Sequence, residues 1–169
     1  NDVLTYLQGC LPVALVPVQV SKDLEMAMIN FNPLSPLKLR DRLREDAAGH
    51  CNRLSRRHEL LVPLLIYACA DLERLKEGDF ARKKAYGDLA GCPLLPMADR
   101  TVRPYPRSLR DRVVIAPPVL HALLPSLRDQ MVHLTLLDYV PISRDPAFRD
   151  KLYIAPLSTS FLQDVMGAV

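Results

Sequence analysis

The sequence predicts an α+β fold in which short strands form small mixed sheets and several helices pack against them. Three observations favour this class. Helical patterns fill much of the first half of the 169-residue chain, strand-like stretches bounded by prolines follow, and a strand–Ile-Ala-Pro–helix unit occurs twice. Hydrophobic residues make up 49% of the chain, enough for a core, while 24% charged residues exclude a membrane protein and a disordered tail.

The stretch SPLKLRDRLRED, residues 35–46, carries the signals of a short helix. Ser35 is a good N-cap, and Pro36 suits the first helical position, where no backbone N–H is needed. Leu39 and Leu43 recur four residues apart and therefore share one face, while the arginines between them turn outward. The pattern predicts a short amphipathic helix.

A longer helix is predicted in LSRRHELLVPLLIYACADLERLKEG. We place its start at Ser55, which opens an imperfect capping box, and its end at Gly78. Pro63 comes too late for a first-turn proline, so the helix either begins near Leu61 or kinks at the proline. The apolar run at residues 60–70 is shorter than the ~20 residues of a membrane span, which indicates a buried core helix.

Short strands are predicted in the second half. The stretch GCPLLPMADRTVRPY, residues 91–105, predicts two strands around a turn at Asp99 and Arg100. A third strand in RVVIAPP, residues 112–118, stops at its prolines, and a helix follows in PPVLHALLPSL. The stretch DQMVHLTL, residues 129–136, returns to strand character.

Internal similarity links distant parts of the chain. Residues 112–127 and 151–166 both contain a strand, Ile-Ala-Pro and then a helix with leucine or phenylalanine at matching spacing. A looser copy occupies residues 14–31, with Ser21 as the expected N-cap. These copies indicate a recurring building block, although uneven spacing excludes a regular solenoid. The alternative is that the two Ile-Ala-Pro tripeptides coincide by chance.

The chain is interpreted as one unit, residues 1–169, with a candidate subdivision near residues 79–93. The part before this point is helical, and the part after it holds the hairpin and the strand–helix units. The four cysteines are irregularly spaced and form no CxxC, so we expect reduced thiols and a cytoplasmic location. The chain begins without methionine, and we expect it to be a segment of a longer protein.

Several kinds of site lack their sequence signals. Structural zinc needs four ligands in paired short spacings, and His50, Cys51 and His58 have no second pair. The chain has no GxSxG elbow and no glycine-rich phosphate loop, and nothing near Cys92 would activate its thiol. We therefore predict no catalytic residue, no metal and no cofactor, and we do not expect this chain to be an enzyme.

The candidate partner-binding residues are arginines in the segment 100–112. They are Arg100, Arg103, Arg107, Arg110 and Arg112. Such a cluster gives an alternative function, a binding module for an acidic partner or for the phosphates of nucleic acid, whereas a solvated hairpin and linker would need no partner. The net charge of +3 is too small to indicate nucleic acid, which is not the expected partner. A remaining enzyme hypothesis needs Asp99 to meet His121 or His133 in a pocket.

Four motifs follow one another between residues 86 and 134. They are a helix end Tyr-x-x-Leu-x-Gly, a proline-bounded Leu-Leu stretch leading to Ala-Asp, a Leu-Leu-Pro helix end and a Val-His-Leu strand. Their residues are Tyr86, Leu89 and Gly91; Pro93, Leu94, Leu95, Pro96, Met97, Ala98 and Asp99; Leu123, Leu124 and Pro125; and Val132, His133 and Leu134. This order resembles the sacsin repeat family. In that family glycine usually follows the Ala-Asp, where this chain has Arg100.

The resemblance implies the non-ATPase portion of a sacsin-type repeat, because the family joins such segments to an ATPase-like module related to the GHKL heat-shock chaperones. It implies a structural or client-binding segment of a large molecular chaperone or co-chaperone. The implied partners are protein clients, other chaperones and neighbouring modules of the same parent chain, without a membrane. The residues interpreted as structural parts of the hairpin are Pro93, Leu94, Leu95, Pro96 and Asp99. Arg100, where glycine is expected, is predicted to be the most unusual backbone position of the hairpin.

Overall fold

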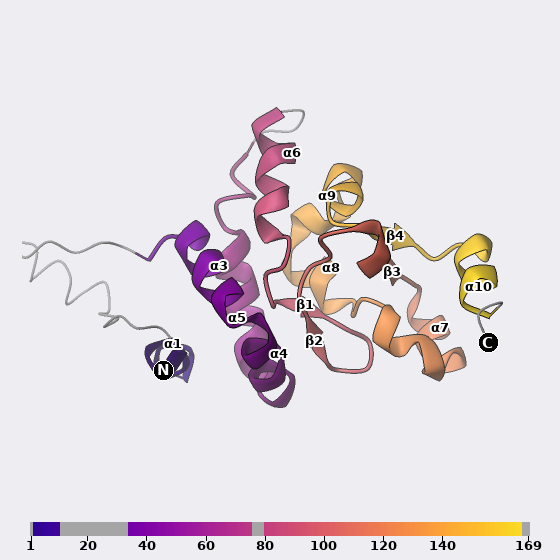
Figure 1. Ribbon diagram of the computed structural model, residues 1–169, viewed down its shortest axis with the longest axis horizontal. Helices are drawn as coiled ribbons and strands as arrows, with labels where there is room; N and C mark the ends of the chain where they lie inside the picture. Colours follow the sequence, from indigo (N-terminus) through magenta and orange to yellow (C-terminus); the bar gives the residue numbers. More distant parts are fainter. Residues whose placement is uncertain (1, 11–33, 76–79, 167–169) are drawn as a thin grey trace, which may run out of the picture.

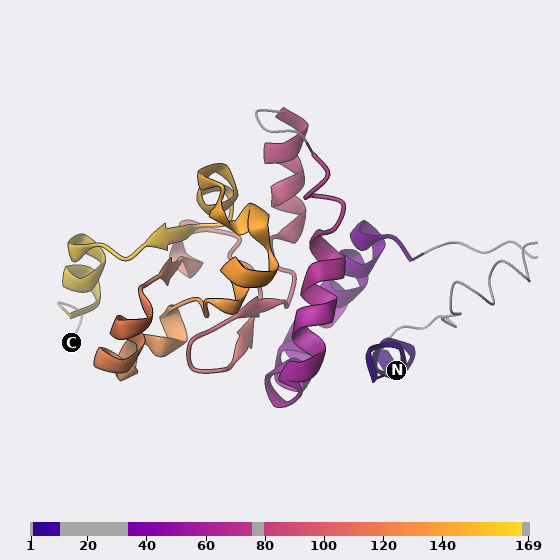
Figure 2. The same ribbon diagram turned by 180° about the vertical axis from the view of Figure 1, so that it is seen from behind.

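The computed structural model describes residues 2–10, 34–75 and 80–166, and it has the predicted α+β class. The first α-helices of the described chain are α1 Asp2–Cys10, α3 Pro36–Glu45, α4 Ala47–Arg56, α5 His58–Cys69 and α6 Phe80–Tyr86. In Figures 1 and 2, α3, α4 and α5 lie together on one side of the molecule, and the later elements lie on the other.

The later elements are short. The strands are β1 Leu95–Pro96, β2 Val102–Arg103, β3 Val113–Ile115 and β4 Ile154–Pro156. The α-helices among them are α7 Pro118–Leu123, α8 Thr135–Tyr139, α9 Pro146–Lys151 and α10 Thr159–Met166. Four short 3₁₀ helices complete the described part of the second half: η1 Gly87–Leu89, η2 Leu109–Asp111, η3 Pro125–Gln130 and η4 Pro141–Arg144. Proline is the first residue of four of these later elements, α7, η3, η4 and α9, as it is of α3, because a missing N–H is harmless at a helix start.

The predicted short amphipathic helix is confirmed as α3. The hydroxyl of Ser35 accepts a hydrogen bond from the backbone N–H of Lys38 at 3.3 Å, and Pro36 is the first helical residue. The leucine face made by Leu39 and Leu43 is fully buried. Local capping and periodicity are therefore sufficient to specify this helix.

The longer helix predicted from Ser55 to Gly78 is wrong at both ends. Ser55 lies inside α4, where its hydroxyl donates a hydrogen bond to the carbonyl of Cys51 at 2.7 Å instead of capping a new helix. The helical conformation is interrupted at Arg57, and a separate helix, α5, begins at His58 and ends at Cys69. Gly78 lies outside the described residues. Pro63 is the sixth of the twelve residues of α5, so the helix begins three residues before Leu61, and the proline removes one hydrogen bond from its interior.

The predicted hairpin is confirmed by the antiparallel pair β1–β2. Leu95 pairs with Arg103 and Pro96 with Val102. In the turn, Asp99 Oδ1 accepts hydrogen bonds from the backbone N–H and the hydroxyl of Thr101, at 2.9 and 2.6 Å. The carboxylate thus holds the turn in the manner of an Asx-type motif.

The first strand of the hairpin has a second neighbour besides β2. The backbone of β1 is also engaged on its other side, where His133 N–H donates to the Pro96 carbonyl at 2.9 Å. Met97, just after β1, forms an isolated antiparallel bridge with Val132. The first strand of the hairpin therefore lies between two neighbours.

Arg100 has a φ of 69°, and it is the one non-glycine residue of the hairpin in the left-handed region. This confirms the prediction that it is the unusual backbone position. A left-handed conformation costs a residue with a Cβ roughly 1–2 kcal/mol, and glycine avoids this penalty.

We expect Arg100→Gly to raise the free energy of unfolding by about 1 kcal/mol, because the backbone strain is relieved while the turn hydrogen bonds remain. Chemical denaturation measures the change. Arg100→Ala is the matched control: it removes the same side-chain charge but keeps the Cβ, so it should bring no gain. Equal stability of the two variants would contradict the role assigned to φ.

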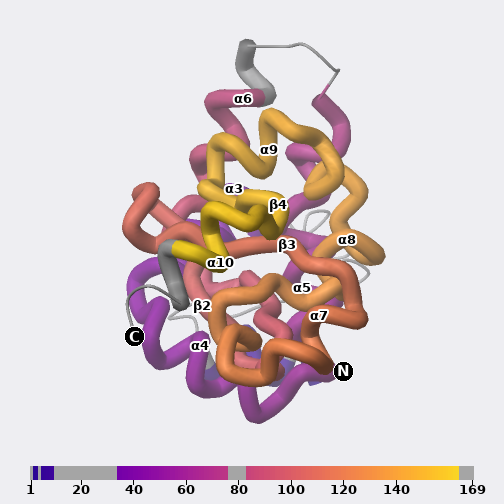
Figure 3. The backbone as a smooth tube through the Cα atoms, turned by 90° about the vertical axis from the view of Figure 1, so that its right-hand side faces the viewer, coloured from indigo at the N-terminus to yellow at the C-terminus, as the bar shows by residue number. Residues whose placement is uncertain are grey.

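The two Ile-Ala-Pro units form adjacent parallel strands. Ile154 pairs with Val113 and Pro156 with Ile115, so the two copies lie side by side with a shift of two residues. Each strand is followed by its own helix, α7 after β3 and α10 after β4, and Figure 3 shows the two strands next to each other. The strand–helix predictions for these units are confirmed, whereas the looser copy at residues 14–31 lies outside the described residues.

The strand predicted over residues 129–136 is wrong for most of its length. Only Met131 and Val132 make isolated bridges, to Val114 and Met97, and α8 begins at Thr135. The imidazole Nδ1 of His133 accepts a hydrogen bond from the Thr135 N–H at 3.1 Å, which favours a turn over continued strand. The two bridges connect the hairpin with the β3–β4 pair.

The larger hydrophobic core draws side chains from both sides of residues 79–93. It includes Leu39 and Leu61 from the helical part together with Leu95, Leu136 and Phe148 from the second part. A smaller cluster packs β3 against η3 and α10 through Val114, Ala116, Leu127, Met131 and Phe161. Among the described residues, no helix has the length and apolar character needed to cross a membrane.

Candidate binding pocket

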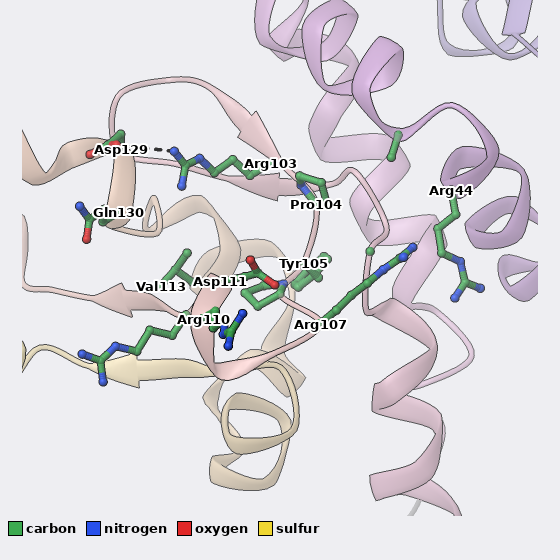
Figure 4. Close-up of a pocket in the computed structure, with 14 residues that line it drawn as sticks. Arg44, Arg103, Pro104, Tyr105, Arg107, Arg110, Asp111, Val113, Asp129 and Gln130 are labelled. Carbon is green, nitrogen blue, oxygen red and sulfur yellow. Dashed lines mark ion pairs between the residues drawn. The ribbon is translucent and has the colours of Figure 1, made fainter.

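An open pocket of about 880 Å³ lies between the carboxyl-terminal end of α3 and the arginine-rich segment (Figure 4). We call it the basic pocket, because five arginines and two aspartates line it. Its lining is Arg44, Ala47, Gly91, Arg103, Pro104, Tyr105, Pro106, Arg107, Arg110, Asp111, Arg112, Val113, Asp129 and Gln130. The excess of cations makes it suited to a negatively charged ligand group.

Tyr105 anchors the segment that carries the arginines. Its backbone N–H donates to the carbonyl of Cys92 at 2.9 Å, and its own carbonyl accepts from the N–H of Gly91 at 2.8 Å. The ring is buried and meets Phe148 edge-on, with ring centroids 6.3 Å apart. Arg103 and Arg107, two residues away on either side, are thereby held at the wall of the pocket.

Gly91 allows the Arg107 side chain to lie directly against the backbone. Gly91 has a φ of 78°, and a Cβ built on it would lie 2.2 Å from Nε of Arg107. The positive φ favours glycine at this position, and a larger residue would also require the Arg107 side chain to move. In Figure 4 the side chain of Arg107 extends toward the side of the pocket on which Arg44 lies.

The arginines of the pocket differ in how they are paired. Arg103 Nη2 lies 3.5 Å from Asp129 Oδ2, and the guanidinium of Arg112 lies over the Phe161 ring at 5.3 Å. Within the part of the chain that the structure describes, Arg107 and Arg110 form no ion pair and no side-chain hydrogen bond. Their charges are therefore available to a ligand.

Arginines of the helical part are neutralised locally, in contrast to Arg107 and Arg110. Four of them form ion pairs with carboxylates on the same or the adjoining stretch of chain: Arg42–Glu45, Arg44–Asp41, Arg53–Asp46 and Arg57–Glu59. Among the described residues, Arg56 on α4 is also exposed without an ion pair, but only the basic pocket brings two such arginines, Arg107 and Arg110, into one lining. The pocket is the better candidate for recognition of an anionic group.

Four of the five arginines singled out from the sequence line the basic pocket, and Arg100 does not. Arg100 lies at the hairpin turn, where its carbonyl oxygen is 2.6 Å from Nε2 of His58. The sequence did not indicate Arg44, which α3 brings to the pocket, or Asp129, which η3 contributes. Both come from other elements, so spacing along the chain gives no signal for them.

The five residues interpreted as structural parts of the hairpin do not line the basic pocket. Pro93, Leu94, Leu95 and Pro96 are buried, and Asp99 is exposed at the turn. The basic pocket contains none of the three residues of the enzyme hypothesis, Asp99, His121 and His133. Asp99 and His133 instead bond to nearby threonines, Thr101 and Thr135.

The cysteines show the environment expected of inert thiols. Cys51, Cys69 and Cys92 are free, and burial raises the pKa of Cys51 to about 11 and that of Cys92 to about 12. Burial also raises the pKa of Cys69 strongly. A thiol with so high a pKa is a poor nucleophile at neutral pH. The described residues hold no group of three histidine, cysteine or acidic side chains that could bind a metal.

Comparisons with known proteins were negative: no protein-family model, curated protein or solved structure significantly matches the chain. The functional interpretation therefore depends on the basic pocket itself and on the motifs of the sequence.

Proposed function

We propose that the chain is a non-catalytic partner-binding segment and that its basic pocket binds an acidic segment of a protein. The observation that carries this proposal is the exposure of Arg107 and Arg110 in an open pocket without any ion pair among the described residues. Guanidinium groups donate several hydrogen bonds in a planar array that matches carboxylates, so they suit the side chains of aspartate and glutamate.

An acidic protein segment fits the pocket better than nucleic acid. Recognition of a nucleic-acid backbone uses an extended basic stripe with many phosphate contacts. Here Arg42, Arg53 and Arg57 pair with local carboxylates, and Asp111 and Asp129 within the pocket would repel successive phosphates. A short segment with a few carboxylates needs fewer contacts and brings fewer negative charges close to these two aspartates.

The parent of this segment is, in our proposal, a large sacsin-type chaperone or co-chaperone of the cytoplasm, whose ATPase module lies outside this chain. The sequence motifs of the hairpin region support this assignment, and the free thiols of Cys51, Cys69 and Cys92 suit a reducing compartment. The acidic segment would then belong to a client protein, another chaperone or a neighbouring module of the same parent chain.

We expect a fluorescently labelled oligoglutamate peptide to bind the chain with an affinity that falls steeply as salt is added. Arg107→Gln should weaken this binding about tenfold, because one charge-assisted hydrogen bond is lost. The matched control is Arg100→Gln, which removes the same charge outside the pocket and should change the dissociation constant by no more than about twofold. Fluorescence anisotropy measures all three proteins.

Two outcomes would overturn the proposal. Equal losses in Arg107→Gln and Arg100→Gln would mean that net charge, and not the pocket, governs binding. The second outcome is that the chain binds a labelled oligothymidylate more tightly than the peptide and that Arg107→Gln loses this binding. That result would assign the pocket to nucleic acid instead.

A further inference from the structure

We propose that the carboxylate of Asp129 pairs with Arg103 in the free chain, at the place where a carboxylate of the partner binds. An acidic partner then displaces Asp129 from Arg103. This inference rests on the proposed function of the basic pocket, and it concerns what sets the affinity of that pocket. The observation behind it is an ion pair inside the binding site: Arg103 Nη2 lies 3.5 Å from Asp129 Oδ2 (dashed line in Figure 4).

The two carboxylates of the pocket are held differently. Asp111 accepts a hydrogen bond from the hydroxyl of Ser108 at 2.9 Å, and both residues belong to the turn around η2. Asp129 lies in η3, far from Arg103 in the sequence, and reaches an arginine of the β1–β2 hairpin. Asp111 thus shapes its own turn, whereas Asp129 neutralises a ligand-binding side chain.

The Arg103–Asp129 pair has the features of a displaceable contact. Its side chains are 44% and 48% exposed, and a single separation of 3.5 Å is longer than that of a good charge-assisted hydrogen bond. Exposed ion pairs of this kind contribute little to stability. A carboxylate that approaches Arg103 from solvent with both oxygens would form the stronger, bidentate arrangement.

This arrangement defines the ligand as a segment with more than one carboxylate. One carboxylate replaces Asp129 on Arg103, and others meet Arg107 and Arg110, which have no ion pair among the described residues. A ligand with one carboxylate can bind Arg107 or Arg110 without displacing Asp129, whereas a ligand with several carboxylates can also engage Arg103, so the displacement favours multiply charged segments.

The test measures binding of the oligoglutamate peptide to Asp129→Asn and to Asp111→Asn. Both variants remove one negative charge from the pocket, but only the first releases Arg103. Asp129→Asn should bind the peptide about three- to fivefold more tightly than the unmodified chain, and Asp111→Asn should gain clearly less. Adding Arg103→Gln to Asp129→Asn should abolish the gain, as a double-mutant cycle requires.

The outcomes separate this inference from the proposed function. Suppose that the unmodified chain binds the peptide through Arg107. If Asp129→Asn then binds the peptide no more tightly than the unmodified chain does, or no more tightly than Asp111→Asn does, the displacement is wrong and the pocket assignment stands. If neither the unmodified chain nor Asp129→Asn binds the peptide at low salt, both proposals are wrong. Circular dichroism of each variant checks that the fold is unchanged.

Discussion

Replacing Asp71 with alanine is expected to lower the free energy of unfolding by about 3 kcal/mol, because it leaves a buried cation without its counter-ion. Arg40 on α3 is 1% exposed and donates to both carboxylate oxygens of Asp71, at 2.7 and 2.9 Å. It also donates to the carbonyl of Ala68 at 2.5 Å. Burial disfavours the charged form of Arg40, but the hydrogen bonds and charge of Asp71 outweigh this effect and raise its pKa.

The matched variant for this prediction is Arg40→Met. It removes the cation but keeps most of the apolar stem, and Asp71, whose side chain is 38% exposed, can be solvated by water. We therefore expect a smaller loss, about 1–2 kcal/mol, in urea denaturation. A loss in Arg40→Met equal to or greater than that in Asp71→Ala would contradict the asymmetry between the two partners.

Because the pair joins α3 to the end of α5, it also supports the wall of the basic pocket that Arg44 forms.

Replacing Phe148 with alanine should lower the free energy of unfolding by about 3–4 kcal/mol, since the lost apolar contacts leave a cavity in the larger core. The ring is fully buried and meets Tyr86 and Tyr105 edge-on, with centroid distances of 5.2 and 6.3 Å. Through Tyr105 it supports the segment that carries Arg103 and Arg107. Chemical denaturation followed by circular dichroism measures the loss.

Phe148→Leu is the control, because leucine keeps much of the volume without the aromatic edge contacts. Its expected loss is about 1 kcal/mol. If alanine and leucine at this position destabilised the chain equally, the packing of the ring between the two tyrosines would not be the source of its contribution.

The parts of the fold that the sequence predicts correctly depend on signals contained in a few consecutive residues. Ser35 and Pro36 specify the start of α3 by capping, and the hairpin turn follows from Asp99 and its neighbours. The strained φ of Arg100 is predictable because the turn needs a residue there that tolerates the left-handed region.

The errors concern features decided by contacts between distant segments. Ser55 has the character of an N-cap, but α4 continues past it, and its hydroxyl also accepts a hydrogen bond from the Val102 N–H at 2.8 Å. The strand expected around Met131 is reduced to single bridges, because its neighbours are the hairpin and β3 rather than a regular sheet. Local pattern carries no information on such partners.

The basic pocket was predictable only in part for the same reason. The arginines of segment 100–112 are close in sequence, so their clustering is visible before the fold is known. Which of them face a common pocket depends on the hairpin turn, which carries Arg100 away from it. Arg44 and Asp129 join the site only through the packing of α3 and η3.

The most direct test of the central claim is an NMR titration of the isotopically labelled chain with the oligoglutamate peptide. If the basic pocket is the binding site, the largest shifts should fall on the backbone amides of Gly91, Arg107 and Arg110, which surround the available charges. Shifts centred instead on α4, around Arg53 and Arg56, or spread evenly over all surface arginines, would contradict the assignment of partner binding to this pocket.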